Sequence, residues 1–174
     1  MNLTGLQIIR EQKKGKIAVS PFNEHDVNPN SYNYHLSSEL YVLNRQIVLD
    51  PLKKTRTKKI PFTSGKGYVL QPGHVYLAST AESIGSEEYV ISLIGRSSLG
   101  RLGLFLQITA DLGQLGTNHA WTLELTVVQP LKIYPGMKIV QITFWKRAGK
   151  NDLKYKGGYA LYSKPHISDF YKEV

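Results

Sequence analysis

Residues 94–104 read Ile94-Gly95-Arg96-Ser97-Ser98-Leu99-Gly100-Arg101-Leu102-Gly103-Leu104 and lie between two apolar runs, residues 89–94 and 104–108. The stretch concentrates two arginines, two serines and three glycines, and its apolar flanks are typical of strands. Guanidinium groups, hydroxyls and the backbone N–H groups of a glycine-containing turn are the groups that proteins use to hold phosphate. A basic surface turn between two strands has the same composition, so composition leaves both interpretations open.

Short apolar runs separated by turn residues continue outward from this stretch in both directions. The turns include Asn28-Pro29-Asn30, Gln71-Pro72-Gly73 and Tyr134-Pro135-Gly136. Many short strands at regular spacing predict a mostly β domain of the sandwich or jelly-roll barrel type. The run 31–43 indicates a strand with an irregularity near Ser37-Ser38. Because no repeat and no linker divides the chain, residues 1–174 are expected to form one domain.

A short helix is predicted at the N-terminus, over residues 5–14. Thr4 is a candidate N-cap, and Leu6, Ile8 and Ile9 are expected to turn inward.

The composition suits a folded domain in a reducing compartment. Of 174 residues, 41% are hydrophobic and none is cysteine, which excludes disulfides and thiolate metal sites. We find neither a signal-peptide pattern nor an apolar run of membrane-spanning length. The expected location is therefore the cytoplasm, with no membrane partner.

The net charge of +9 calls for an anionic partner or a solvated basic segment. Five cations fall in one tract, Lys53, Lys54, Arg56, Lys58 and Lys59, which we interpret as a solvated loop. Nucleic acid and a nucleoside triphosphate would both be attracted to such a protein. Nucleic acid is not favoured as the main partner, because the motif arginines lie elsewhere.

Glu124 stands in an otherwise uncharged apolar strand. Because strand side chains alternate, it shares a face with Thr122 and Thr126, while Leu123 and Leu125 share the other. An exposed acid on a half-solvated sheet is one interpretation. A carboxyl removed from water is the other, and its raised pKa would suit a proton shuttle.

The order of the motifs resembles the dCTP deaminases of the dCTP deaminase/dUTPase superfamily. Residues 96–104 resemble the signature of that family, and four further elements stand in the order of the family. They are Asn28-Pro29-Asn30-Ser31-Tyr32-Asn33, Thr122-Leu123-Glu124-Leu125, Tyr134-Pro135-Gly136-Met137-Lys138-Ile139 and Tyr155-Lys156-Gly157-Gly158-Tyr159. Five elements in order over nearly the whole chain are far more specific than any one of them.

The resemblance implies a distorted jelly-roll or β-barrel of the dUTPase-like type. It further implies a homotrimer with active sites shared between subunits, and a mobile tail, residues 150–174, that closes over the nucleotide. The implied reaction is zinc-independent hydrolytic deamination of a cytosine nucleotide, dCTP or a close analogue, to the uracil nucleotide and ammonia.

The same resemblance assigns roles to individual residues. Glu124 is the implied proton shuttle, and Arg101 would hold the attacking water and the developing charge beside it. Ser97 would bond near the base and the α-phosphate. Arg96 and Ser98 would contact the triphosphate of a substrate that reaches in from a neighbouring subunit.

Further substrate contacts are implied in two other segments. Residues 110–121 would form a hairpin that reads the pyrimidine with backbone groups, and two tyrosines of the tail would close over the sugar and phosphates. The residues concerned are Ala110, Gln114, Thr117, Trp121, Tyr155 and Tyr159.

The expected metal is magnesium, carried in by the triphosphate rather than held in a protein cage. Zinc is not expected, because the chain lacks cysteine and no two of its five histidines have ligand spacing.

Several positions depart from the family pattern. The sugar-contacting aspartate of the family is Gln114 here, the following aromatic is Thr117, and a later glycine is His119. A glycine replaced by histidine predicts a different turn. In the tail Gly158 stands where the family has a lysine, for which Lys164 is a candidate substitute.

These departures leave three alternatives beside a simple deaminase. The reaction is retained with a different sugar, phosphate count or C5 substituent. The chain is a dUTPase-like or bifunctional hydrolase, although Gln114 removes the expected water-activating carboxylate and Asp111 is out of register. Or it is a non-catalytic nucleotide-sensing trimer.

Overall fold

The computed structural model describes residues 1–43, 48–106, 110–150, 153, 155 and 157–173. The strands are β1 (Ala18–Ser20), β2 (Tyr32–Leu43), β3 (Thr57–Lys59), β4 (Tyr68–Leu70), β5 (Tyr76–Gly85), β6 (Tyr89–Gly95), β7 (Leu104–Leu106), β8 (Leu112–Gly113), β9 (Asn118–Val127), β10 (Leu131–Ile133) and β11 (Lys138–Lys146). The helices are α1 (Gly5–Lys13) and α2 (Ser97–Gly100), with 3-10 turns η1 (Glu24–Asp26), η2 (Gly158–Leu161) and η3 (Phe170–Lys172). The expectation of a mostly β fold with a short N-terminal helix is confirmed.

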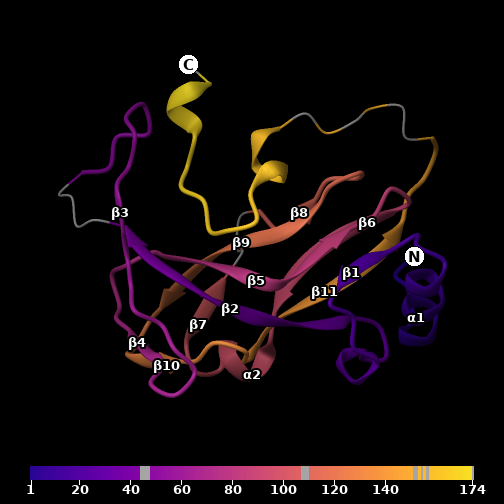
Figure 1. Ribbon diagram of the computed structural model, residues 1–174, viewed down its shortest axis with the longest axis horizontal. Coiled ribbons are helices and arrows are strands. Elements are labelled where there is room, and N and C mark those ends of the chain that lie inside the picture. Colours follow the sequence, from indigo (N-terminus) through magenta and orange to yellow (C-terminus); the bar gives the residue numbers. More distant parts are fainter. Residues whose placement is uncertain (44–47, 107–109, 151–152, 154, 156, 174) are drawn as a thin grey trace.

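One curled sheet makes up most of the molecule (Figure 1). Its described strands run in the order β7-β9-β5-β2-β11-β6-β8, with β1 added on β5 and β3 on β2, while β4 and β10 form a separate ribbon. The long strand β2 joins the two halves, because its first residues pair with β11 and its later residues pair with β5. This exchange of partners along one strand curls the sheet around the core.

The irregularity predicted near Ser37-Ser38 is confirmed as a register shift of β2 against β5 between Leu36 and Leu40. A second shift occurs in β5, between Ser79 and Ser83, where β5 faces β9. Such bulges add twist and re-aim the side chains beside them. Both irregularities lie at the strands that carry the candidate site.

At the second bulge a buried hydroxyl takes the place of a missing ladder bond. The Thr80 hydroxyl accepts the backbone N–H of Trp121 at 2.9 Å and donates to the carbonyl oxygen of Glu82 at 2.7 Å. Because buried backbone groups need partners, this side chain holds β9 at the point where β5 bulges away.

The core fills the inside of the curled sheet. Its largest fully buried side chains include Tyr32, Tyr34 and Phe144. On β9, Leu123 and Leu125 are completely buried in this core. Since side chains alternate along a strand, the residues between them face the other way.

Helix α1 buries Ile8 as predicted, but the prediction for Leu6 is wrong. Ile8 is fully buried, but Leu6 is 71% exposed. Two residues correspond to about 200° around a helix, so Leu6 points away from the buried stripe of Gly5, Ile8 and Glu11. Thr4 occupies the N-cap position, yet its side chain makes no capping bond.

The basic tract is also more ordered than a solvated loop. Thr57–Lys59 forms strand β3, which pairs antiparallel with Tyr41–Leu43 of β2. Thr57 is half-buried, whereas Lys58 and Lys59 are exposed. Pairing with β2 therefore gives strand structure to residues 57–59, which we had interpreted from their charge as part of a solvated loop.

Within the described ranges, no helix has the length and apolar character needed to cross a membrane.

Candidate active site

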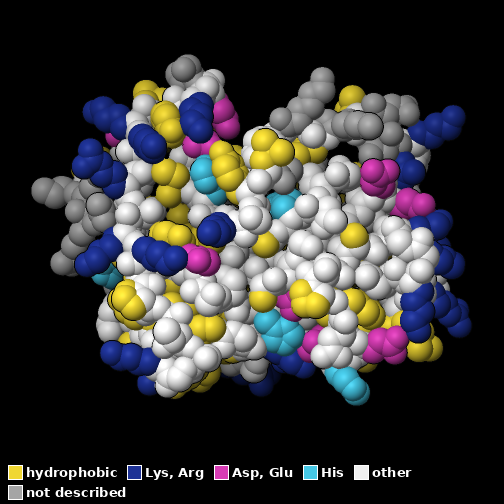
Figure 2. Space-filling view, in the orientation of Figure 1, with side chains coloured by type: hydrophobic (Ala, Val, Ile, Leu, Met, Phe, Trp, Pro, Cys, Tyr) yellow, Lys and Arg dark blue, Asp and Glu magenta, His cyan; other side chains and the backbone are white. Residues whose placement is uncertain are grey.

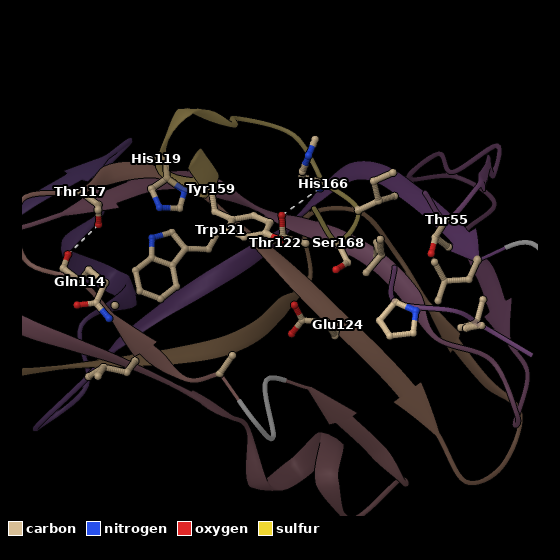
Figure 3. A pocket seen from close by; sticks show the side chains of 18 of the residues that line it. Thr55, Gln114, Thr117, His119, Trp121, Thr122, Glu124, Tyr159, His166 and Ser168 are labelled. Atoms are coloured by element: carbon tan, nitrogen blue, oxygen red, sulfur yellow. Dashed lines mark hydrogen bonds between the residues drawn. The ribbon is translucent and has the colours of Figure 1, made fainter. Parts of the chain in front are cut away.

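A cavity of about 640 Å³ opens between β9, the segment that follows β2 and the C-terminal segment. Figure 3 shows Glu124 at its middle, Gln114 and Thr117 at one end and Thr55 at the other. Seven residues assigned to substrate or catalysis line it: Ala110, Gln114, Thr117, Trp121, Glu124, Tyr155 and Tyr159. Its size and its mixture of apolar walls and a few polar groups are typical of a small-molecule site.

Glu124 points into this cavity (Figure 3). The predicted alternation is confirmed, because Thr122 also lines the cavity while Leu123 and Leu125 lie in the core. The carboxyl is accessible from the cavity, but the surrounding walls take much of its water away. This desolvation raises the pKa of Glu124 above the ordinary 4.5. A carboxyl with a raised pKa is suited to both accept and return a proton.

The segment 110–121 is not the hairpin that we predicted. Its first arm, β8, pairs with β6, whereas its second arm, β9, pairs with β5 and β7. The chain therefore crosses between two regions of the curled sheet at this point. The cavity lies in the opening that this crossing leaves.

The turn between β8 and β9 is held by one hydrogen bond within it and one to Ser86. The Thr117 hydroxyl is buried and donates to the carbonyl oxygen of Gln114 at 2.9 Å. The backbone N–H of Gly116, whose φ is +83°, donates to Ser86 at 2.8 Å. Thr117 thus lines the cavity with its hydroxyl already engaged in the turn.

His119 does not create a turn, although it stands where the family has glycine. It is a strand residue of β9, and its ring stacks on Trp121 with centroids 5.7 Å apart and planes 10° from parallel. The Trp121 ring in turn lies so close to Gly113 that a Cβ there would meet it at 2.0 Å. The substitution therefore adds a second ring to the cavity wall instead of changing the backbone.

The C-terminal segment covers the cavity from the other side. The backbone N–H of His166 donates to the Thr122 hydroxyl at 3.1 Å, and that of Asp169 donates to the Tyr159 hydroxyl at 2.8 Å. The His166 ring stacks on Tyr162 and lies 3.0 Å from Asp169. The described part of the expected tail therefore docks on β9 two residues before Glu124.

The residues of α2 line no part of this cavity within one chain. Helix α2 and the C-terminal segment lie at opposite edges of the view in Figure 1. Ser97, Ser98 and Arg101 are exposed, and the Arg96 guanidinium donates to the Asn33 side chain. The Arg/Ser motif thus meets the N-terminal family motif, while the predicted contact of Arg101 with Glu124 stays a prediction.

Sequence reasoning missed several residues of the cavity. They are Asp50, Lys53, Thr55, His166 and Ser168, together with apolar residues of the segment after β2. No local pattern marks them, because the curl of β2 and the docking of the tail bring them there. Lys164, the candidate substitute for the missing tail lysine, does not line the cavity.

No three His, Asp or Glu side chains in the described ranges converge in a way that could hold a metal ion. The described carboxylates of the cavity are Glu124 and Asp50, and Asp50 is paired with Lys53 at 3.2 Å. A divalent cation at this site would therefore need most of its ligands from phosphate and water.

Comparison with known proteins places these features in context. A model of the dCTP deaminase-like family matches residues 2–147. A Clostridium acetobutylicum protein named "dCTP deaminase, dUMP-forming" is 43% identical over 159 residues, which cover 91% of this chain and 89% of that protein. A Rhodopirellula baltica protein named "dCTP deaminase" is 43% identical over 150 residues, covering 86% of this chain and 74% of the other.

The fold also matches a solved structure, that of 2'-deoxycytidine 5'-triphosphate deaminase from Agrobacterium tumefaciens. The TM-score is 0.64 at 22% identity, and the match covers 82% of this chain. This chain spans about half of that one, since the match covers 47% of its length.

Proposed function

This chain belongs to the dCTP deaminase-like family, and we propose that it is an enzyme that deaminates dCTP or a close analogue. One observation carries the proposal beyond family membership. The glutamate of the Thr-Leu-Glu-Leu motif, Glu124, points into a cavity of nucleotide size, and its pKa is raised by desolvation.

The reaction replaces the exocyclic amine of cytosine with oxygen. Water adds at C4, and Glu124 accepts its first proton and passes it to N3. Glu124 then takes the second proton from the new C4 hydroxyl and passes it to the amine, so that the C4 carbonyl forms as the C4–N4 bond breaks and ammonia leaves. General acid–base help of this kind contributes about 10²–10⁴-fold in rate.

The water is activated in this proposal by a carboxylate and not by zinc. The reason is the available metal ligands, because zinc deaminases hold the metal with cysteine and histidine and this chain has no cysteine. Magnesium is proposed to enter with the triphosphate. Activity should therefore survive treatment with a zinc-selective chelator and fall when magnesium is withdrawn. Stoichiometric zinc in active protein, with loss of activity on its removal, would contradict this part.

A second candidate function is favoured by the printed names of several relatives. Proteins named "dCTP deaminase, dUMP-forming" suggest that this chain also removes pyrophosphate, so that dUMP and not dUTP is released. Gln114 cannot act as the base for that step. Among described cavity residues Asp50 is the other carboxylate beside Glu124. Separating dUMP from dUTP among the products of dCTP, with pyrophosphate measured in parallel, decides between the two.

We propose that the working unit is a homotrimer whose active sites take α2 from a neighbouring subunit. The support is that Ser97, Ser98 and Arg101 are exposed and lie outside the cavity of their own chain. Apolar side chains stand exposed on either side of α2, with Ile94 44% and Phe105 42% accessible. Exposed apolar side chains grouped beside a polar motif are a feature of association surfaces.

Mixing two inactive variants tests this arrangement. Glu124→Gln and Arg101→Ala chains, unfolded and refolded together, form trimers in which about one site in four combines an intact Glu124 with an intact Arg101. Activity that appears only in the mixture supports a shared site. A mixture as inactive as its parts, or a fully active monomer by light scattering, would contradict it.

The substrate itself is identified by a panel of cytosine nucleotides. The panel varies the sugar, the phosphate count and the C5 substituent, and ammonia release is the readout. Ammonia from dCTP or a close analogue supports the enzyme. Tight nucleotide binding with no product from any member would support a nucleotide sensor instead. The cytoplasm is the location proposed for such an enzyme.

A further inference from the structure

Positive side chains gather at two ends of the molecule. Figure 2 shows dark-blue groups on the side that carries β3 and on the side that carries α1. The basic tract contains β3. Arg10 lies in α1, and Lys146 and Arg147 stand at the end of β11, where the Lys146 N–H donates to Met1. Only the first adjoins the cavity, because Lys53 and Thr55 lie in its wall.

Two of the five cations of the basic tract form ion pairs with described residues, and three do not. Lys53 pairs with Asp50 and Lys59 with Glu39. Lys54, Arg56 and Lys58 are exposed, and none of the three forms an ion pair with any residue that the structure describes. Strand β3, which contains Lys58, is fixed by pairing with β2. Lys58 therefore has a defined position, and Lys54 and Arg56 lie in the same tract, next to the cavity-lining Thr55.

The cavity itself offers little attraction to a polyanion. Of its described lining residues, Lys53 is the one with a fixed positive charge, and Asp50 and Glu124 are carboxyls. The tail contributes no cation at Gly158, and Lys164 lies outside the lining. Within one chain, the further described cations that can attract a triphosphate toward this cavity lie in the basic tract at its rim.

We propose that Lys53, Lys54, Arg56 and Lys58 form a capture patch that draws the polyphosphate of the nucleotide to the cavity. This inference rests on the proposed function for the identity of the ligand. The patch acts before the chemistry, by raising the local concentration of the anion and its rate of arrival. Steering by charges around a cleft raises association rates about 10–10³-fold and weakens with salt.

A compact phosphate chain fits the patch better than nucleic acid does. The patch runs from Lys53 to Lys58, so even fully extended it spans no more than about 20 Å. The tract from Pro51 to Pro61 contains no aromatic residue on which bases could stack. Single-stranded nucleic acid is held by a longer basic groove with stacking side chains.

The test neutralises the three unpaired cations together, as Lys54→Gln, Arg56→Gln and Lys58→Gln in one chain. The matched control carries Arg10→Gln, Lys146→Gln and Arg147→Gln, which changes the charge equally at the opposite end of the molecule. At low salt the patch variant should lose about 10-fold in kcat/KM for dCTP at unchanged kcat, and the loss should shrink in 0.5 M salt. The control should change by less than about 2-fold.

A phosphate series makes the result specific. By calorimetry, the patch variant should raise the Kd most for dCTP, less for dCDP and least for dCMP. The Kd for deoxycytidine should not change. An equal effect on all four, or an equal effect of the control variant, would overturn the proposal. So would tight, patch-dependent binding of a single-stranded oligonucleotide with dCTP kinetics unaltered.

The calorimetric arm separates this proposal from the proposed function. If dCTP binding depends on the patch but no ammonia appears, the capture patch is supported and the deaminase assignment is contradicted. If ammonia appears and the patch variant has the same kcat/KM as the control variant, the deaminase assignment is supported and the capture patch is contradicted.

Discussion

Replacing Thr80 with Val removes one hydroxyl from the bulge between β5 and β9. The side chain is 1% exposed, and its oxygen serves Trp121 N–H at 2.9 Å and the Glu82 carbonyl at 2.7 Å. Valine has the same shape without the hydroxyl, so the buried N–H of Trp121 is left without that partner. Leaving a buried donor unsatisfied costs about 1–3 kcal/mol of unfolding free energy.

The expected shift in melting temperature follows from this cost. For a protein of this size, 1 kcal/mol corresponds to about 2–4 °C, so a cost near 2 kcal/mol lowers Tm by about 4–8 °C. Because Trp121 lies in the cavity wall, KM for the nucleotide should rise more than kcat falls. Thermal unfolding at a fixed protein concentration and steady-state kinetics measure the two effects.

Thr143→Val is the matched control. The Thr143 hydroxyl donates to Ser92 at a longer 3.4 Å and accepts from Trp145, whose side chain is 44% exposed and can bond water instead. Its loss should cost less than about 1 kcal/mol and leave KM unchanged. Equal Tm shifts in both variants, or an unchanged KM in Thr80→Val, would refute the role of this hydroxyl in holding the cavity wall.

Three further predictions concern the cavity. Gly113→Ala puts a Cβ 2.0 Å from the Trp121 ring, so the ring must move. We expect a loss of about 1–3 kcal/mol in unfolding free energy and a changed Trp fluorescence spectrum. An unchanged spectrum and Tm would contradict this prediction. Because desolvation raises the pKa of Glu124 in the free protein, the carboxylate needed as base is lost as pH falls through that raised value, and kcat/KM should decline on the acid side above pH 4.5. A carboxyl whose pKa is raised in the folded state destabilises the native protein at pH values above that pKa. Glu124→Gln should therefore match or exceed the wild type in Tm at neutral pH, and the difference should vanish below about pH 4.5. Urea unfolding measured as a function of pH checks this.

The sequence predicted those parts of the fold that depend on local pattern. Alternation along the chain predicted the face of Glu124, and two serines in an apolar run predicted the bulge in β2. Both are signals carried by neighbouring residues. The family resemblance supplied the roles of Arg96, Ser97 and Arg101, which no local pattern assigns.

Other parts depend on contacts between distant segments and could not be predicted. Lys53 reaches the cavity because β2 changes partners and curls the sheet. The two arms of segment 110–121 look like a hairpin in sequence, yet β8 pairs with β6 while β9 pairs with β5 and β7. His119 was expected to alter a turn, but stacking on Trp121 keeps it in a strand.

The central claim is that Glu124 moves the proton in cytosine deamination, and one variant tests it most directly. Glu124→Gln keeps the size of the side chain and removes its basicity, while the nucleotide-binding groups are unaltered. Ammonia release from dCTP and dCTP affinity are measured on the variant beside the wild type. We predict a loss of about 10²-fold or more in turnover with affinity largely kept. Turnover near that of the wild type would remove Glu124 from the mechanism and contradict the account.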